Sequence, residues 1–394
     1  MTVRTLTALG ALSFGALVAG PAQAQEVVLT TAVPFLQIEP DSRAAGMGMT
    51  GVAIADNAYA PYWNPAGLAG QTGTEVSFTH APWLPALGAN LSYEHLTAKH
   101  GLGSAGTVGG HLTYFDLGTQ TATDDQGNPL GEFSSYELSV GGSYGYPVTE
   151  NLKVGTGARF IYSNLTDGRD VENASTSAGV SFGVDLGMQY TGPDLGLGQS
   201  SKPTIAFNLA NMGPGISYTE NNLFPDAIPT TLRFGGALDT QLDEFNRIQI
   251  ALDLNKVLVS RDSSGSYDPF YQAIFSSWET RDVATTSDRE GRNCTERDAA
   301  IANGAEGVTA CKAVSALQSL TLGAGLEYWY NDLLALRGGY FYEDPANGNR
   351  QFITFGTGIR YSLVGVDISY IYALEENSPL ADQLRFSLLL NIPR

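Results

Sequence analysis

Gly46, Gly48 and Gly51 have the spacing GxGxxG, the pattern of a loop that cradles the pyrophosphate of a dinucleotide. That chemistry also needs a buried strand before the glycines, a helix after them and an acidic residue about 20 positions further on. Here residues 40–43 read Pro-Asp-Ser-Arg, and the chain that follows has the pattern of strands alone. The glycines therefore indicate tight backbone turns, and we expect no cofactor.

The histidines do not form a pattern that would hold a metal or act in catalysis. None of His80, His95, His100 and His111 lies in an HExxH sequence or next to a cysteine. The chain also lacks the GxSxG turn that carries a nucleophilic serine. Polar residues near them are explained more simply as a solvated barrel wall, so we expect no metal site and no enzyme.

Cys294 and Cys311 are the only cysteines of the chain. Two cysteines close in sequence in an exported protein more often form a structural disulfide than a metal site. We therefore expect a disulfide between them that tethers one loop.

The first residues resemble a cleavable signal peptide. Met1 to Arg4 is short and basic, Leu6 to Val18 is apolar, and Ala22-Gln23-Ala24 is a small-x-small cleavage site. The apolar run is too short to cross a bilayer as a helix, and the alternative is a frayed N-terminal helix. We assign residues 1–24 to the signal, which implies that the mature chain works outside the cytoplasm.

The composition agrees with a barrel that crosses a membrane with strands. The net charge of −19 argues against nucleic acid as a partner. The chain has 46 glycines, 19 tyrosines and 17 phenylalanines, with only 15% charged residues. A mean hydropathy of −0.07 is compatible with a barrel, because the lipid face uses only every second residue of a strand.

From Thr74 onward, apolar and polar residues alternate with a period of two. In residues 247–255, Ile and Leu alternate with Arg, Gln, Asp and Asn, so that one face meets lipid and the other water. These runs predict an all-β protein, an antiparallel transmembrane β-barrel of about fourteen strands. The predicted strands are 74–81, 88–98, 105–118, 134–146, 151–164, 177–191, 203–212, 230–240, 247–259, 318–330, 333–343, 351–361, 364–375 and 383–392.

The connections alternate between tight turns and long loops, the longest covering residues 260–317. Short periplasmic turns and long extracellular loops produce this alternation in outer-membrane barrels. It predicts an outer-membrane protein with both termini in the periplasm. The alternative is a soluble β-sandwich, which has no reason to sort its loops in this way.

Residues 25–72 precede the barrel, which we place at 73–394, and they lack strand periodicity. Low charge and many small residues favour packing inside the lumen as a plug. We expect Asn64 to cap a short helix that begins at Pro65. We also expect Asp41 and Arg43 to be hydrogen-bonded and Trp63 to contact the wall.

Three segments resemble the N-terminal signature of the PorV family, within the FadL-like superfamily of outer-membrane barrels. They are FLQIEPDSRAAGMG at 35–48, GVA at 51–53 and WNPAGL at 63–68, and IFSSW at 274–278 resembles an aromatic stretch in the long loop of PorV relatives. The resemblance marks as plug residues Asp41, Arg43, Gly46, Gly48, Gly51, Trp63, Asn64 and Pro65.

The resemblance implies a component of the type IX protein secretion system. Such a barrel would bind the C-terminal signal domain of exported cargo and carry it from the translocon barrel to the surface attachment complex with its sortase. Aromatic residues suit protein interfaces, so the expected binding residues are Phe270, Tyr271, Phe275 and Trp278. Their alternative role is in the interfacial girdle, in contact with lipid and lipopolysaccharide.

Two other functions stay open. A FadL-like transporter of hydrophobic small molecules would use the N-terminal segment as a movable hatch and the loops to shape an apolar pocket. A purely structural barrel would bind no ligand.

Overall fold

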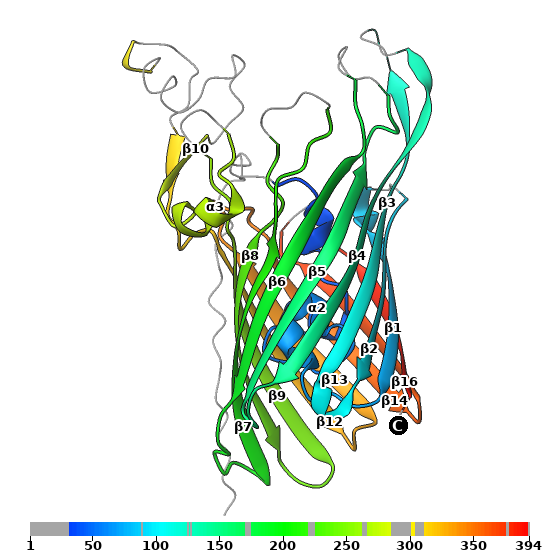
Figure 1. Ribbon diagram of the computed structural model, residues 1–394, viewed down its shortest axis with the longest axis vertical. Helices are drawn as coiled ribbons and strands as arrows, with labels where there is room; N and C mark the ends of the chain where they lie inside the picture. The colour runs from blue at the N-terminus through cyan, green and yellow to red at the C-terminus, as the bar shows by residue number, and fades with distance from the viewer. Residues whose placement is uncertain are drawn as a thin grey trace, which may run out of the picture.

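The computed structural model describes residues 31–87, 90–123, 126, 128–169, 175–219, 225–261, 266–284, 301–303, 311–375 and 378–392. The expected signal peptide, residues 1–24, lies outside them. Fourteen antiparallel strands form one closed barrel in the order β1-β16-β15-β14-β13-β12-β9-β8-β7-β6-β5-β4-β3-β2 (Figure 1). β1 and β16 close it, from the pair Thr74 and Ile392 to the pair His80 and Phe386. The closed barrel confirms the predicted fold and excludes the sandwich.

The strands of the barrel are β1 (Thr74–Trp83), β2 (Leu91–Gly101), β3 (Thr107–Thr123), β4 (Pro129–Pro147), β5 (Leu152–Asn164), β6 (Gly179–Thr191), β7 (Ser200–Met212), β8 (Thr231–Gln241), β9 (Asn246–Val257), β12 (Leu320–Tyr330), β13 (Leu334–Glu343), β14 (Gln351–Tyr361), β15 (Val364–Ala373) and β16 (Leu384–Ile392).

Period-two alternation gives each strand one outer and one inner face. On β9, Ile250, Leu252 and Leu254 are exposed on the outside, whereas Gln249 and Asp253 are buried inside. An exposed face of aliphatic side chains all round a closed sheet is stable in lipid and not in water. The predicted alternation of residues 247–255 is therefore confirmed.

All fourteen predicted strands are present, and the largest differences lie in β3 and β4. Both extend beyond their predicted ends, and a register shift lies between Asp116 and Thr119. Residues 119–123 read Thr-Gln-Thr-Ala-Thr, which lacks apolar alternation because both faces of this part of the hairpin are largely exposed. Hydrophobic periodicity cannot detect such an extension.

The connections are sorted by length. Tight turns join strands at one end of the barrel, which we call the turn end; Ser362 and Leu363 alone connect β14 and β15. The opposite end, the loop end, carries the long connections (Figure 1). The longest connection contains the helix α3 (Phe270–Ser276) and a two-stranded sheet of β10 (Arg281–Ala284) and β11 (Cys311–Val314), which the sequence did not predict.

The chain before β1 runs through the interior of the barrel. It contains the short helices η1 (Pro34–Gln37), α1 (Ser42–Ala45), α2 (Ala60–Trp63) and η2 (Pro65–Leu68). Two further 3-10 helices lie between strands of the barrel: η3 (Pro85–Leu87) between β1 and β2, and η4 (Gly103–Ala105) between β2 and β3. The segment before β1 starts at the loop end, where the Ala32 amide donates to the Ala227 carbonyl at 3.0 Å. β16 finishes at the turn end, so the first and last described residues lie at opposite ends of the barrel. The N-terminus itself belongs to residues 1–30, and its periplasmic placement stays a prediction.

The outward leucines give a test of the membrane face. Leu252→Arg places a charge on the exposed face of β9 and should lower the free energy of unfolding in lipid vesicles by about 2–4 kcal/mol. Leu195→Arg is the matched control, because both leucines are 53% exposed but Leu195 lies in the turn between β6 and β7. The control should change the free energy of unfolding by about 1 kcal/mol or less. Equal effects of the two substitutions would contradict the assignment of the face.

Candidate functional site

Residues 31–72, which we call the lumen segment, fill much of the barrel interior. Its apolar side chains are almost completely buried, including Val52, Tyr59 and Leu68 at 0 to 1% exposure. The wall faces them with small or polar residues, such as Ser77, Ser139 and Ser387. The segment therefore supplies the apolar core that the strands, with their apolar faces turned outward, cannot supply.

Arg43 is the strongest polar contact between the lumen segment and the wall. Its guanidinium donates to both carboxylate oxygens of Glu327 on β12, at 2.8 to 3.2 Å, and to Gln249 Oε1 on β9 at 2.9 Å. It also pairs with Asp56 of the lumen segment. Arg43 is 7% exposed and Glu327 fully buried, and a buried charge is tolerated only when it is paired in this way.

Glu327 continues the network along the wall. Arg337 Nε on β13 donates to it at 2.6 Å, and Arg337 NH1 donates to Asp367 on β15 at 2.8 Å. Asp367 also accepts from Arg360 on β14 at 2.6 Å. Positive and negative side chains thus alternate from the lumen segment across four neighbouring strands.

Asp41 organises the first turn of the lumen segment. Its carboxylate accepts from the Ala44 amide at 2.6 Å, as the N-cap of α1, and from the indole Nε1 of Trp63 at 2.5 Å. Asp41 is only 3% exposed, so these two hydrogen bonds satisfy a group that has almost no contact with water. One side chain therefore joins α1 to the end of α2.

The glycines of the GxGxxG sequence lie where the backbone contacts other groups closely. Gly48 has φ +67°, and a Cβ there would lie 2.4 Å from the Ala324 carbonyl oxygen; one at Gly51 would lie 2.1 Å from the Trp63 ring. Asp253 on β9 accepts from the Gly51 and Val52 amides at 2.6 and 3.0 Å. Gly46 packs against the wall at Gly356. These contacts account for all three glycines as packing positions.

Asn64 and Pro65 lie at the start of η2, the last helix of the lumen segment before β1. Asn64 Oδ1 caps η2 by accepting from the Ala66 amide at 3.0 Å, and its Nδ2 donates to the Met188 carbonyl on β6 at 3.1 Å. The Trp63 carbonyl accepts from Asn208 on β7 at 2.9 Å. The lumen segment is thus bonded to both halves of the barrel wall.

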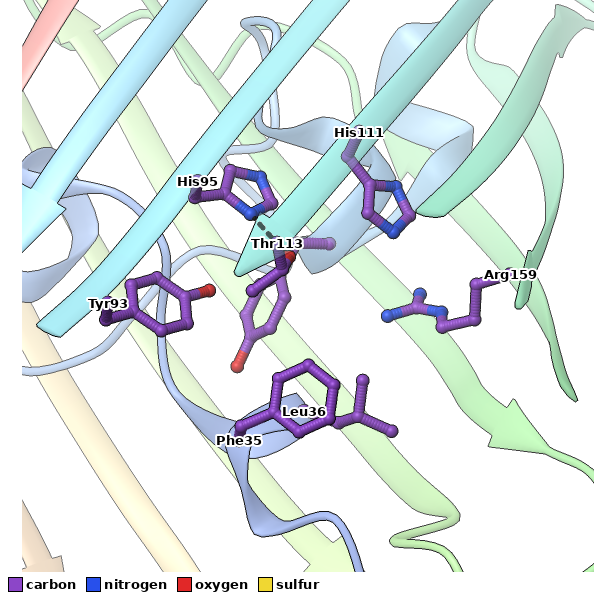
Figure 2. A pocket seen from close by; sticks show the side chains of 8 residues that line it. Phe35, Leu36, Tyr93, His95, His111, Thr113 and Arg159 are labelled. Carbon is purple, nitrogen blue, oxygen red and sulfur yellow. Dashed lines mark hydrogen bonds between the residues drawn. The ribbon is translucent and has the colours of Figure 1, made fainter. Parts of the chain in front are cut away.

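Towards the loop end, η1 lies against a cluster of polar wall residues. Figure 2 shows Phe35 and Leu36 facing His95, His111 and Arg159, with His95 bonded to Thr113 at 2.9 Å. The space between these side chains is about 10 Å³, enough for about one water molecule.

A larger cavity of about 630 Å³ lies between the lumen segment and the long loops, and we call it the outer vestibule. Its floor includes Met49 and Trp63, and its wall includes residues from β1, β8, β9 and β12–β15. Its size is that of a pocket for a small ligand.

The aromatic residues predicted to bind a partner lie in and beside α3. Phe275 is 77% exposed, Tyr271 57% and Trp278 43%, and Phe270 is half-buried with its ring edge-on to Tyr271 at 5.7 Å. The Trp278 indole donates to the Ile274 carbonyl at 3.0 Å. α3 lies at the loop end (Figure 1), so these three large exposed side chains belong to that end of the barrel.

Lys256 fixes the place of α3 on the barrel. By alternation with Ile250, Leu252 and Leu254 it lies on the outer face of β9, yet it is only 2% exposed. Its ammonium lies 5.0 Å from the centre of the Trp278 ring and donates to Ser319. α3 therefore rests beside the barrel wall, and Trp278 covers a charge that would otherwise face lipid.

The predicted residues thus fall into two separate places. The eight plug residues gather in the lumen, and the four aromatic residues lie at the outer wall. Cys294 lies outside the described residues, and β11 places only the backbone of Cys311, so the disulfide stays a prediction that mass spectrometry of unreduced protein would test. Within the described part of the chain there is no group of three or more potential metal ligands, and no helix long and apolar enough to cross a membrane.

Sequence reasoning did not single out the wall partners Glu327, Arg337, Asp367 and Asp253. All four occupy inward positions of predicted strands, so a charge on the polar face was the available signal. Their pairing with the lumen segment depends on how that segment threads the barrel, which the sequence did not indicate.

The barrel resembles solved transporter structures at low identity. The Ralstonia pickettii toluene transporter TbuX shares 14% identity over 90% of this chain and 98% of its own, with a TM-score of 0.48. The P. putida toluene transporter TodX shares 12% over 90% and 99%, with a TM-score of 0.49, and a Pseudomonas aeruginosa FadL homologue shares 11% over 93% and 99%, with a TM-score of 0.43. These identities and TM-scores are too low to indicate what this chain binds or transports. A search of the curated proteins finds no match.

The closed strand order, the lipid face and the filled lumen define an integral membrane β-barrel with an internal N-terminal segment. The family model described as type IX secretion system protein PorV matches residues 21–264. The chain belongs to this family, which makes it an outer-membrane barrel of the type IX secretion system.

The Arg43 network predicts how firmly the lumen segment is held. Arg43→Ala leaves Glu327 buried with one fewer cation and should destabilise the lumen segment by about 3–5 kcal/mol. Hydrogen exchange of residues 44–68 would then accelerate in the otherwise intact barrel.

The control is Arg247→Ala, because Arg247 is 27% exposed and its carboxylate partners lie at 3.5 and 3.8 Å. It should cost about 1 kcal/mol or less. Unchanged exchange in Arg43→Ala would show that the network does not hold the segment.

Proposed function

We propose that this barrel binds the C-terminal signal domain of exported proteins at its loop end and carries it from the translocon barrel to the attachment complex and its sortase. The observation that carries the proposal is the exposure of Tyr271 and Phe275 on one short helix and of Trp278 directly after it. A few exposed aromatic side chains commonly supply most of the binding energy of a protein interface. Membership of the type IX secretion family supports an exported protein as the partner.

The filled lumen supports a binding role over passage of a solute. Arg43, Asp41 and Asn64 bond the lumen segment to itself and to the wall on both sides of the barrel. We infer that the turn end faces the periplasm, as short turns do in bacterial barrels, and that the protein binds without catalysing a reaction.

The alternative is the transport of hydrophobic small molecules, and the outer vestibule favours it. Its volume of about 630 Å³ suits a small apolar ligand. In that case the lumen segment must move to let the solute pass, which requires the Arg43 contacts to break.

Replacing Phe275 and Trp278 together by Ala should abolish capture of cargo. Each aromatic anchor contributes about 2 kcal/mol or more at such an interface, about thirtyfold in Kd. The barrel should assemble normally, because loop side chains take no part in the strand ladder. The measurement is co-purification of cargo from strains that express the variants equally.

Phe275→Ala alone tests the binding of cargo without disturbing the contact of α3 with the barrel. Trp278 also covers Lys256, whereas Phe275 is the most exposed of the three aromatic side chains. This single substitution should therefore also weaken the capture of cargo. Tyr361→Ala is the matched control, since Tyr361 is 76% exposed at the turn end. If wild-type protein brings down neither cargo nor a secretion partner, the proposal should be abandoned for the transporter.

A further inference from the structure

Three polar side chains face the outer vestibule with buried atoms that have no hydrogen-bond partner among the described residues. Gln383 is 1% exposed, and both its amide nitrogen and its amide oxygen are unpaired. Asn255 Oδ1 and Glu375 Oε1 are the others. Buried polar groups are nearly always bonded, so an unpaired donor beside three unpaired acceptors indicates a bound species that supplies both kinds of group.

The part of the cavity wall next to these polar atoms is apolar. Phe341 and Phe352 stack at 4.7 Å with an interplanar angle of 6°, and they form one buried cluster with Met49 and Ile371. All four residues line the vestibule. Water would satisfy the amides, whereas a ligand with an apolar part would also extend this apolar cluster.

Arg350 and Glu343 on the rim of the cavity neutralise each other. Arg350 donates to Glu343 at 2.6 and 3.1 Å, and Asn347 adds a third bond to the same carboxylate at 3.1 Å. A ligand with a formal charge therefore has no evident counter-ion at this part of the rim.

We propose that the outer vestibule binds a short uncharged segment of polypeptide whose apolar side chains contact the Phe341 and Phe352 surface and whose backbone amides pair with Gln383, Asn255 and Glu375. The inference rests on the proposed function, because the segment belongs to the exported protein that the barrel holds. A backbone presents an N–H and a C=O at every residue, which matches the unpaired donor and acceptors. A pure hydrocarbon would leave all of them dry and unpaired.

Met49 gives a direct reporter of the cavity, because it lies on the vestibule floor whereas Met188 lies on the outer face at 46% exposure. The full chain, labelled with ¹³C at the methionine methyls and held in lipid nanodiscs, is titrated with a capped pentapeptide of alternating valine and threonine, and separately with toluene. The peptide should shift the Met49 signal to saturation and leave Met188 unmoved.

Gln383→Leu keeps the size of the side chain and removes its amide, and it should weaken the peptide about tenfold, the effect of about one hydrogen bond. The same variant should bind toluene more tightly than wild type, because toluene then no longer leaves the Gln383 amide unpaired. Gln199→Leu, at an exposed turn-end position, should change neither affinity. Heat-modifiable migration on a gel checks that each barrel is closed.

The inference falls if the peptide leaves Met49 unmoved, or if toluene binds wild type as tightly as it binds Gln383→Leu. Cargo capture that depends on Phe275 while the peptide fails to bind would overturn the vestibule site and leave the proposed function standing. Peptide binding without any cargo capture would remove the proposed function and with it the assignment of the segment to cargo.

Discussion

The guanidinium of Arg43 lies inside a membrane barrel, where a charge is tolerated because it is paired, above all with the buried carboxylate of Glu327. Glu327 in turn is buried between Arg43 and Arg337, and Arg337 shares Asp367 with Arg360. Removing any member takes one charged partner away from a side chain that is largely buried. The lumen segment and the wall of β12–β15 are therefore stable as one unit, and the position of the segment follows from that pairing.

Because the lumen is filled, the surfaces that can bind a partner lie at the loop end. Tight contacts such as those of Gly48 and Gly51 leave little free space around the segment, whereas the vestibule above it keeps about 630 Å³. Outside the wall, Trp278 covers Lys256 and holds α3 with Phe275 turned outward. Two chemically different surfaces thus lie near the same rim, an aromatic helix outside and an apolar cavity with unpaired amides inside.

The sequence predicted the barrel well because its strands obey one rule. A lipid face on every second residue makes Ile250, Leu252 and Leu254 visible as a pattern, and all fourteen strands follow from it. The rule fails where both faces are exposed, as in residues 119–123, and in the long loop, where α3 and the β10 and β11 pair were not predicted. The plug residues could be selected by resemblance, but Glu327 and Asp253 could not be matched with Arg43 and Gly51, because those pairs lie more than 200 positions apart in the chain.

We infer that the Arg43 and Glu327 pair keeps the lumen segment in place and the barrel closed. Single-channel recording in planar lipid bilayers tests it most directly, with wild type and Glu327→Gln compared under the same voltage. Glu327→Gln keeps the shape of the side chain but removes the charge that Arg43 requires. We expect a silent wild-type barrel and discrete openings in Glu327→Gln. A wild-type barrel that conducts steadily, or a variant that stays as silent as wild type, would contradict it.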